Sequence, residues 1–332
     1  MSKKQNGVVR LQFHVWRVYF TRVAQGNFSL SSAYLLSRAS LTGSLIRPRT
    51  LWITETMNQE KKDLLCFALV VVLATTLIVA CFPLFHITSN WAANVLMFVP
   101  GLVAAALLLR RREAFGSVGW GFGPWRYWLA AIVLPTLAIL IAVTISLRLG
   151  YAAPAPLSTP AGSLIVHPAK LLNNMFIYLV ISLPLAFGEE FGWRGYAQPR
   201  LIRQFGLIPG LLGLGLIWGL WHTPIYYAMH VYPDHPFLGP FVMTPIDNIL
   251  VVVPMAWLYI RSRSIWVPTF THAFADILWG FSGLMFPATH EIQNWAVLQV
   301  VQVIISAVLL IDLMSKRQDS SEPKLQQSSV SA

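Results

Sequence analysis

Charged residues are scarce in this chain of 332 residues: Asp, Glu, Lys and Arg together make up 11% of it. A soluble domain usually carries about a quarter of its residues as charged side chains. No charged residue occurs between positions 64 and 109, whereas hydrophobic residues account for 56% of the chain. With a mean hydropathy of +0.60, the composition excludes an ordinary soluble domain and indicates a protein embedded in lipid.

Cysteine and the common catalytic strings are also rare or missing. The two cysteines, Cys66 and Cys81, lie inside an apolar run, and we predict small buried hydrophobic residues rather than a disulfide. The strings HExxH, GxSxG, GxGxxG and the P-loop are absent. The familiar zinc-protease helix and the serine nucleophile elbow are therefore not supported.

Acidic residues are missing from the N-terminal part of the chain, where the first one is Glu55. Much of the formal net charge of +11 comes from this part, residues 1–56, so the charge does not indicate nucleic-acid binding. Three interpretations of residues 1–56 stay open. They form a flexible or surface-associated arm, a transit-like segment rich in Arg and Ser, or a stretch upstream of a true start at Met57, which we favour.

Long hydrophobic segments separated by short polar loops fill the rest of the chain. About 20 apolar residues cross a bilayer as a helix, and the segment without charge is long enough for two helices divided near residues 86–90. The pattern predicts an all-α fold, a polytopic transmembrane helical bundle of about eight helices, with an Ala/Pro/Ser-rich loop at 148–168. The expected helices are 64–85, 91–109, 127–147, 171–190, 208–229, 246–260, 265–286 and 294–314.

Basic residues occur in alternate loops. Lys and Arg collect in the short cytoplasmic loops of membrane proteins, and the loops near 86–90, 230–243 and 287–293 contain neither. The alternation predicts an integral, multi-pass membrane protein with both termini in the cytoplasm. The basic groups are Lys61 with Lys62, Arg110 to Arg112 with Arg126, Arg194 with Arg200 and Arg203, Arg261 with Arg263, and Lys316 with Arg317.

Ionisable side chains within apolar segments are costly in a membrane, so each needs a reason. Asp276 follows His272 by four residues, which places both on one side of a helix. Glu189 and Glu190 close another apolar segment, and Arg194 follows Glu190 at the spacing of a helical ion pair. Each of these features alone is about as often structural as functional, because a buried Asp can simply join two helices and a Glu–Arg pair can end one.

A further histidine, His222, lies deep in its segment, four residues after Trp218 and two before Pro224. A single histidine there is more often a packed core residue. Two carboxylates, two histidines and one aspartate on three helices, however, are groups that can activate water and stabilise an oxyanion. They also suit a zinc site, because Zn²⁺ takes imidazole and carboxylate ligands and leaves a position for water. The residues alone leave both options open.

Three short motifs resemble those of the CPBP family of intramembrane proteases, which comprises CAAX proteases and bacteriocin-processing, Abi-like proteins. Residues 189–194, EEFGWR, match its EExxxR motif; residues 218–222, WGLWH, are similar to FxxxH; and residues 272–276, HAFAD, are similar to HxxxN or HxxxD. They occur in the family's order, and the resemblance covers about residues 170–290. The Trp in place of Phe is expected to alter packing or access rather than chemistry.

The resemblance implies hydrolysis of a peptide bond in a cavity near the cytoplasmic side, in some members at prenylated CAAX tails. Glu189 with His222 would activate the water, and Arg194 would fix the glutamate pair. An ionised Asp276 cannot donate to an oxyanion, so it would be protonated, position His272 or bind a metal. The cofactor would be Zn²⁺, with a metal-free mechanism as the alternative. The implied catalytic residues are Glu189, Glu190, Arg194, His222, His272 and Asp276, and the implied metal ligands are Glu189, His222 and His272.

On this basis we predict a membrane-embedded endopeptidase whose partners are membrane lipid and a protein or peptide substrate, lipidated in the CAAX case, and not nucleic acid. The chain then divides into the basic extension 1–56, N-terminal transmembrane helices 57–168, a catalytic helical core 169–315 and a disordered polar tail 316–332. Two other functions stay open. One is a non-catalytic immunity or scaffold-type relative, and the other is a transporter that uses the buried charges.

The depths of the site residues present one difficulty. His222 lies about 15 residues into its segment, roughly 22 Å from the segment's start, whereas Glu189 at the end of its helix is expected near the cytoplasmic face. The two can meet only if residues 204–214 form a surface or re-entrant stretch. We predict such a stretch from Pro209 and the glycines that follow it.

Overall fold

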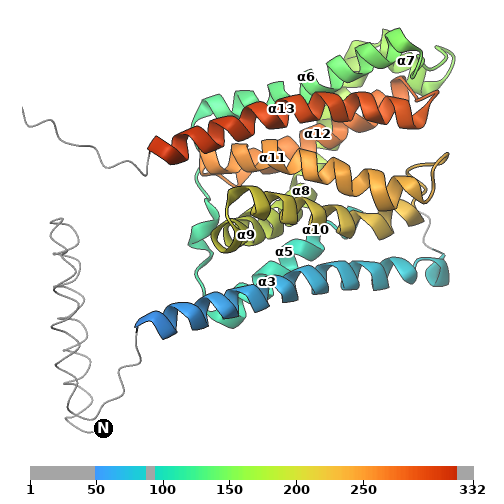
Figure 1. The fold of residues 1–332 in the computed structure, drawn as a ribbon. Helices are drawn as coiled ribbons and strands as arrows, with labels where there is room; N and C mark the ends of the chain where they lie inside the picture. The colour runs from blue at the N-terminus through green and yellow to red at the C-terminus, as the bar shows by residue number, and fades with distance from the viewer. Residues whose placement is uncertain (1–48, 87–93, 320–332) are drawn as a thin grey trace, which may run out of the picture. The chain divides into compact units, whose positions relative to one another are not determined.

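The computed structural model describes residues 49–86 and 94–319 (Figure 1). The chain divides into two compact units, Met1–Thr56 and Met57–Ala332. Apart from residues 49–56, which begin the first described helix, all described residues belong to the second unit. Residues 1–48 of the predicted extension, and residues 320–332 of the predicted tail, lie outside the described residues. The boundaries of the four predicted regions therefore stay predictions.

Helices account for the regular structure of the described residues, apart from one isolated β-bridge between Ala152 and Ala288. Figure 1 shows the long helices running side by side, and each of the eight predicted helices has a counterpart, which confirms the all-α bundle. The α-helices of the described residues, including α7 and α9, which were not among the eight, are α3 (Arg49–Ala80), α5 (Phe98–Arg111), α6 (Trp125–Leu149), α7 (Pro160–Val166), α8 (Pro168–Glu190), α9 (Gln198–Phe205), α10 (Leu207–Ala228), α11 (Thr244–Ser262), α12 (Trp266–Met285) and α13 (Glu291–Asp319), with 3₁₀-helices η1 (Pro83–Phe85) and η2 (Phe115–Val118) and π-helices η3 (Phe191–Ala197) and η4 (Gly239–Met243).

Six helical segments within the described ranges are long and apolar enough to cross a membrane. The protein is thus an integral, multi-pass membrane protein. The predicted span at 91–109 is not among these segments: α5 has only 14 residues where about 20 are needed, and residues 91–93 lie outside the described residues. Helix α12 forms as predicted but is not among the six. The six are Gln59–Phe85, Trp125–Leu149, Pro168–Phe205, Leu207–Ala228, Gly239–Ser262 and Glu291–Ser315.

The predicted loop 148–168 contains the short helix α7, so that prediction was wrong over residues 160–166. The helix starts there because Thr159 accepts a hydrogen bond on its hydroxyl from the Gly162 N–H at 3.0 Å. Pro160 then occupies the first helical position, where its missing N–H costs nothing. Cys66 and Cys81 are both free, but they are half-buried and not buried as predicted.

Helix α3 has two apolar sides, one that packs into the protein core and one that faces outward. Leu65, Leu69 and Leu73 recur every four residues and are 51–61% exposed, whereas Phe67 and Val71 are at most 1% exposed. Residues at this spacing share one side of a helix. One side of α3 therefore packs into the protein core, and the other presents leucines that only lipid can cover favourably.

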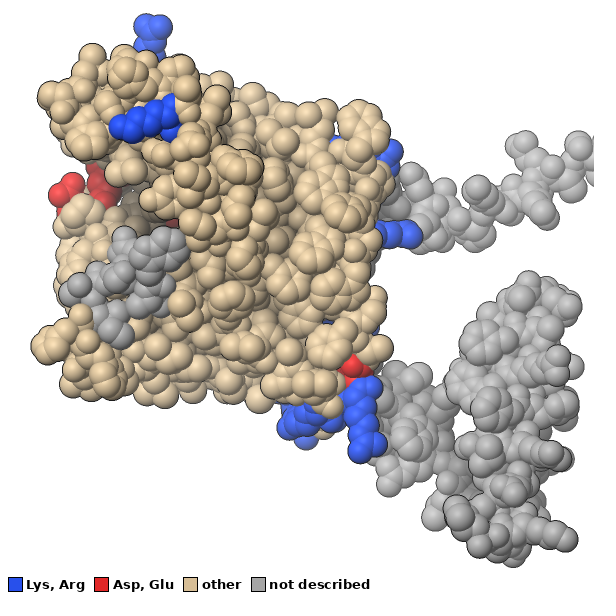
Figure 2. Space-filling model, turned by 180° about the vertical axis from the view of Figure 1, so that it is seen from behind, with Lys and Arg blue, Asp and Glu red and all other residues tan. Residues whose placement is uncertain are grey.

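Basic side chains gather mainly at one end of the bundle (Figure 2). Several pair there with acids from other helices, which ties α3 to α5 and α9, and α11 to α13. Arg194 was predicted in a basic loop at this end, and that prediction was wrong: it lies inside η3 and is 0% exposed. The pairs are Asp63 with Arg110 and Arg111, each at 2.8 Å, Glu60 with Arg203, Glu113 with Arg200, and Asp312 with Arg261 at 2.6 Å.

The path of the chain after Glu190 explains how the Glu pair and His222 lie at similar depths in the bundle. Helix α8 continues through η3 and α9 until Gly206, whose φ of +88° breaks the helix. Glu190 lies sixteen residues before Gly206 and His222 sixteen after it, so both are far from the turn. The predicted surface or re-entrant stretch at 204–214 was wrong, since α10 begins at Leu207 and buries residues of its first turns. The apolar run stops at the Glu pair and so predicts a helix end there, but the helical segment continues as η3 and α9.

Short helix α5 packs directly against the turn of α8 that precedes the Glu pair. A Cβ atom added at Gly101 would lie 2.4 Å from the carbonyl oxygen of Gly188, and one added at Gly192 would lie 2.5 Å from the carbonyl carbon of Pro100. Real Cβ atoms do not approach backbone that closely. The absence of side chains at these glycines lets α5 support the backbone on both sides of Glu189 and Glu190.

Replacing Gly101 by alanine should therefore destabilise the protein, because the methyl group forces α5 and α8 apart. We expect a cost of about 1–3 kcal/mol, typical of overpacking. The matched control is Gly213→Ala in α10, where an added Cβ meets nothing within 4 Å and helix propensity favours Ala. Thermal unfolding in detergent would compare the two. Equal midpoints for the two variants would contradict the close approach.

Candidate active site

The carboxylate of Glu189 is held by two tryptophans. Its Oε2 atom accepts hydrogen bonds from the indole Nε1 of Trp193 at 3.2 Å and of Trp218 at 2.9 Å. Glu189 is 1% exposed, and an indole N–H is a neutral donor that never accepts. The carboxylate is therefore fixed in direction, and among the described residues no cationic side chain is in direct contact with it.

Its neighbour Glu190 has a different environment. Glu190 Oε1 accepts from Arg194 Nη1 at 2.9 Å and lies 2.7 Å from His272 Nδ1. Glu190 and Arg194 are both 0% exposed, and the ion pair has the i, i+4 spacing expected from the sequence. The two adjacent glutamates are thus chemically distinct: Glu190 is bound to a cation and an imidazole, whereas Glu189 has neutral donors.

The imidazole of His272 lies between two carboxylates. Its Nδ1 faces Glu190, and its Nε2 lies 3.5 Å from Asp276 Oδ2. A charged histidine can donate at both nitrogens, although 3.5 Å is long for a hydrogen bond. The side chain of His272 is 7% exposed and that of Asp276 is 56% exposed. The cluster is therefore closed to the surroundings at the buried glutamates and open to them at Asp276.

The space-filling view shows one face of the molecule hollowed, with acidic atoms in and beside the hollow (Figure 2).

The second histidine, His222, is oriented by its own helix. Its Nδ1 lies 3.1 Å from the carbonyl oxygen of Trp218, and its ring packs against Trp221 and Tyr226 at centroid distances of 4.6 and 5.2 Å. A carbonyl only accepts, so this contact places the proton on Nδ1. In the neutral ring, Nε2 is then left without a proton and can accept one.

Trp218 connects the residues of three helices. Its ring lies 5.8 Å from His222 and 5.6 Å from His272 by centroid, and the Arg194 guanidinium sits 4.1 Å above it. Its indole also donates to Glu189, a bond that a phenylalanine cannot make. The expectation was that Trp at this motif position alters packing or access rather than chemistry; in the structure it also adds a hydrogen bond to Glu189.

Sequence reasoning missed Trp193 as a part of this cluster. Trp193 is 0% exposed, and a buried indole N–H normally finds an acceptor. It follows Glu189 by four residues, just as Arg194 follows Glu190. That spacing was available in the sequence, and it would have identified Trp193 as a donor to Glu189.

The three predicted metal ligands do not converge. Glu189 Oε2 is taken by two indole donors, and both nitrogens of His272 face carboxylates. Across residues 49–86 and 94–319, no three His, Cys, Asp or Glu side chains are grouped so that they could hold a metal ion. The set Glu189, His222 and His272 thus does not fit Zn²⁺ in this arrangement.

Comparison with known proteins agrees with the motifs. Residues 171–278 match the family model for type II CAAX prenyl endopeptidase Rce1-like proteins, which confirms the predicted resemblance over this segment. The segment runs from α8 into α12 and contains all six predicted catalytic residues. A protein of Methanococcus maripaludis named CAAX prenyl protease 2 is 28% identical over 89 residues. That match covers 26% of this chain and 32% of the relative, so it spans about a third of the relative's length.

Proposed function

We propose that this chain is a membrane-embedded endopeptidase that hydrolyses a peptide bond with water activated by Glu189. The observation that carries the proposal is the contrast between the two glutamates. Glu190 is neutralised by Arg194 at 2.9 Å, whereas the donors to Glu189 among the described residues are two neutral indoles. A buried, oriented carboxylate without a bound cation is suited to accept a proton from water.

In this mechanism Glu189 takes a proton from a water molecule while the oxygen of that water attacks the carbonyl carbon of the peptide bond. His222 Nε2, which its Nδ1 contact leaves unprotonated, helps to orient that water. The C–N bond then breaks, and the proton held by Glu189 passes to the leaving amine. Positioned general bases of this kind contribute about 10²- to 10⁴-fold to rate.

His272 is the proposed donor to the oxyanion. Glu190 fixes its Nδ1 side at 2.7 Å, which directs Nε2 toward the open end of the cluster. Asp276, 3.5 Å away and largely exposed, would position this imidazole, so it does not have to donate to the oxyanion itself. Donors directed at a developing negative charge stabilise the transition state more than the ground state.

The proposed substrate is a protein or peptide with a lipidated, CAAX-type C-terminus. The description of the matching family and the name of the relative support it, as does the placement of the site among apolar, membrane-crossing helices. The test uses purified protein in liposomes with a farnesylated peptide and the same peptide without the lipid. We expect mass spectrometry to detect cleavage of the farnesylated peptide. Failure of folded protein to cleave either peptide would reject the proposal.

We also propose that the basic end of the bundle, with both chain termini, faces the cytoplasm. Basic groups near helix ends favour that side, and Arg110, Arg203 and Arg261 all pair with acids at this end. Reporter fusions at the loop containing Arg112 and at the loop near Asp234 should report opposite sides of the membrane. The same side for both would contradict this orientation.

Hydrolysis should survive removal of metal ions, because the proposed mechanism uses only side chains and water. We expect activity to stay within about twofold after treatment with a strong chelator, compared with the loss that removal of a catalytic zinc causes. Elemental analysis would verify that the treated sample is metal-free. Loss of activity that added Zn²⁺ restores would show instead that the site rearranges to bind metal.

A further inference from the structure

Four buried polar atoms follow one another along the helix that carries the site. Glu190 Oε2, Arg194 Nε, Arg194 Nη2 and Gln198 Oε1 each lack a hydrogen-bond partner among the described residues. Glu190, Arg194 and Gln198 recur every four residues from the end of α8 through η3 to the start of α9, so they lie along one side of this continuous helical segment. All three are at most 1% exposed. Buried polar atoms without partners are rare and usually bind ordered water.

The chemistry of these atoms selects water over other small ligands. Two are N–H donors on Arg194, and two are acceptors, one on Glu190 and one on Gln198. A cation would satisfy only the acceptors, and an anion only the donors. Water both donates and accepts, and it adds no charge to the buried Glu190–Arg194 pair.

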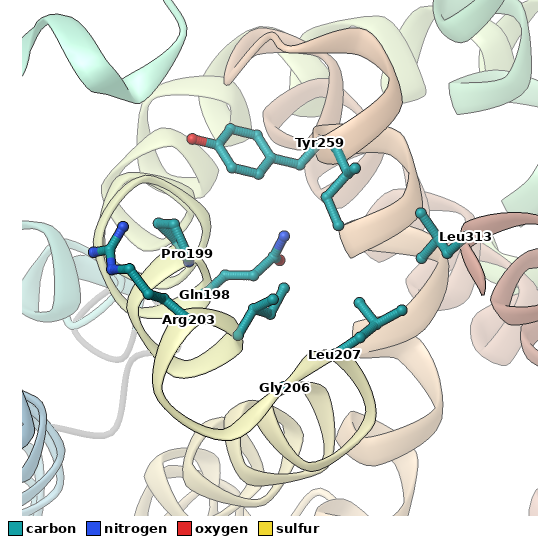
Figure 3. Close-up of a pocket in the computed structure, with 9 residues that line it drawn as sticks. Gln198, Pro199, Arg203, Gly206, Leu207, Tyr259 and Leu313 are labelled. Atoms are coloured by element: carbon teal, nitrogen blue, oxygen red, sulfur yellow. The ribbon is translucent and has the colours of Figure 1, made fainter. Parts of the chain in front are cut away.

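Gln198 also belongs to a cavity at the basic end of the bundle. The cavity has a volume of about 680 Å³ and lies between α9, the start of α10, α11 and α13. Figure 3 shows the Gln198 amide directed into it, with Pro199 and Arg203 beside it. Pro199, Ile202, Leu207 and Leu313 contribute apolar wall. The same side chain therefore borders the cavity and forms the last member of the buried polar series.

We propose that this cavity is the entrance for the water consumed in the reaction, and that water passes Gln198 and Arg194 to reach Glu190. The inference rests on the proposed endopeptidase function and deepens it. Each turnover uses one water molecule, whose hydroxyl joins the carbonyl carbon and whose remaining proton goes to the amine. A substrate that enters between apolar helices would cover the open end at Asp276, so a second, polar route at the other side of the Glu pair would keep the site supplied.

Cysteine labelling tests the route without relying on activity. In a chain with Cys66→Ala and Cys81→Ala, either Gln198→Cys or Leu201→Cys is introduced. Leu201, 6% exposed, is the matched control: it is a large buried residue on the same helix that does not line the cavity. A water-soluble methanethiosulfonate reacts only with a hydrated thiolate. We expect labelling at position 198 to be at least about tenfold faster than at 201. Equal rates, or no labelling at 198, would overturn the route.

Kinetics provide the second test. Gln198→Leu keeps the volume but removes the amide, so kcat for the lipidated peptide should fall about tenfold with KM unchanged, because substrate contacts are untouched. Gln198→Asn restores an amide and should recover much of the loss. An unchanged kcat in a folded Gln198→Leu protein would overturn the route. If the unsubstituted protein cleaves no peptide, the proposed function fails, whereas the labelling experiment still decides whether water reaches position 198.

Discussion

Replacing Glu189 by glutamine is expected to lower kcat for peptide hydrolysis by about 10³-fold, the typical contribution of a general base. Glutamine has the same shape and can still accept a hydrogen bond from Trp193 or Trp218 on its amide oxygen. The fold should therefore survive, and KM should change little. The measurement is a comparison of initial rates for the lipidated peptide at saturating concentration, with thermal unfolding as a check on folding.

The matched control for this experiment is Glu291→Gln. Glu291 is also a glutamate, so the chemical change is the same. It pairs with His235 at 2.7 Å and is not part of the active-site cluster. Its activity should stay close to that of the unsubstituted protein. If Glu189→Gln retains hydrolysis comparable to Glu291→Gln, Glu189 is not the base, and the non-catalytic interpretation of the family resemblance gains support.

Replacing Arg194 by methionine is expected to destabilise the protein by about 3–5 kcal/mol, the usual cost of leaving one partner of a buried ion pair alone. Both Arg194 and Glu190 are 0% exposed. Methionine fills similar volume but provides no charge, so Glu190 would be left with His272 as its remaining partner. Unfolding by heat or denaturant in detergent would measure the loss, with the yield of monodisperse protein as a second readout.

The double variant Arg194→Met/Glu190→Gln tests whether charge, and not packing, causes that loss. Removing both charges takes away the uncompensated carboxylate, and replacing a buried ion pair by neutral groups is often nearly neutral for stability. We expect most of the lost stability to return, although activity should not. A double variant as unstable as Arg194→Met would assign the effect to the contact between the guanidinium and Trp218 at 4.1 Å.

Local spacing was enough to predict some parts of the site. The pairs Glu190–Arg194 and His272–Asp276 each lie on one helix at i, i+4 positions, and both pairs are in contact in the structure. Contacts of this kind depend only on helical geometry, so they can be inferred once the segment is known to be helical. The helices themselves were predictable because lipid requires long apolar runs.

Other features depend on contacts between distant parts of the chain. The sequence suggested a helix end at Glu190, since charged and polar residues follow it. The structure buries all of residues 191–197. Gly192 there lies close to Pro100 of α5 and Gly195 close to Val118 of η2, while Phe67 of α3 packs against Trp193 and Tyr196. The bond from Trp218 to Glu189 joins residues 29 positions apart. No local pattern fixes such a contact, and hydropathy alone misjudged both the length of α5 and the depth of the Glu pair.

The π-helix η3 sets the rotational phase between the Glu pair and α9. Its wider turn, seen in the bond from the Gln198 N–H to the Trp193 carbonyl five residues earlier, amounts to one residue inserted into an α-helix. The wider turn absorbs the extra residue, so α9 keeps nearly the rotational phase that an uninterrupted α-helix one residue shorter would give it. That phase directs Arg200 and Arg203 toward Glu113 and Glu60. A residue inserted within α9 before Arg200, where the winding is α-helical, would instead rotate both arginines by about 100° away from these acids.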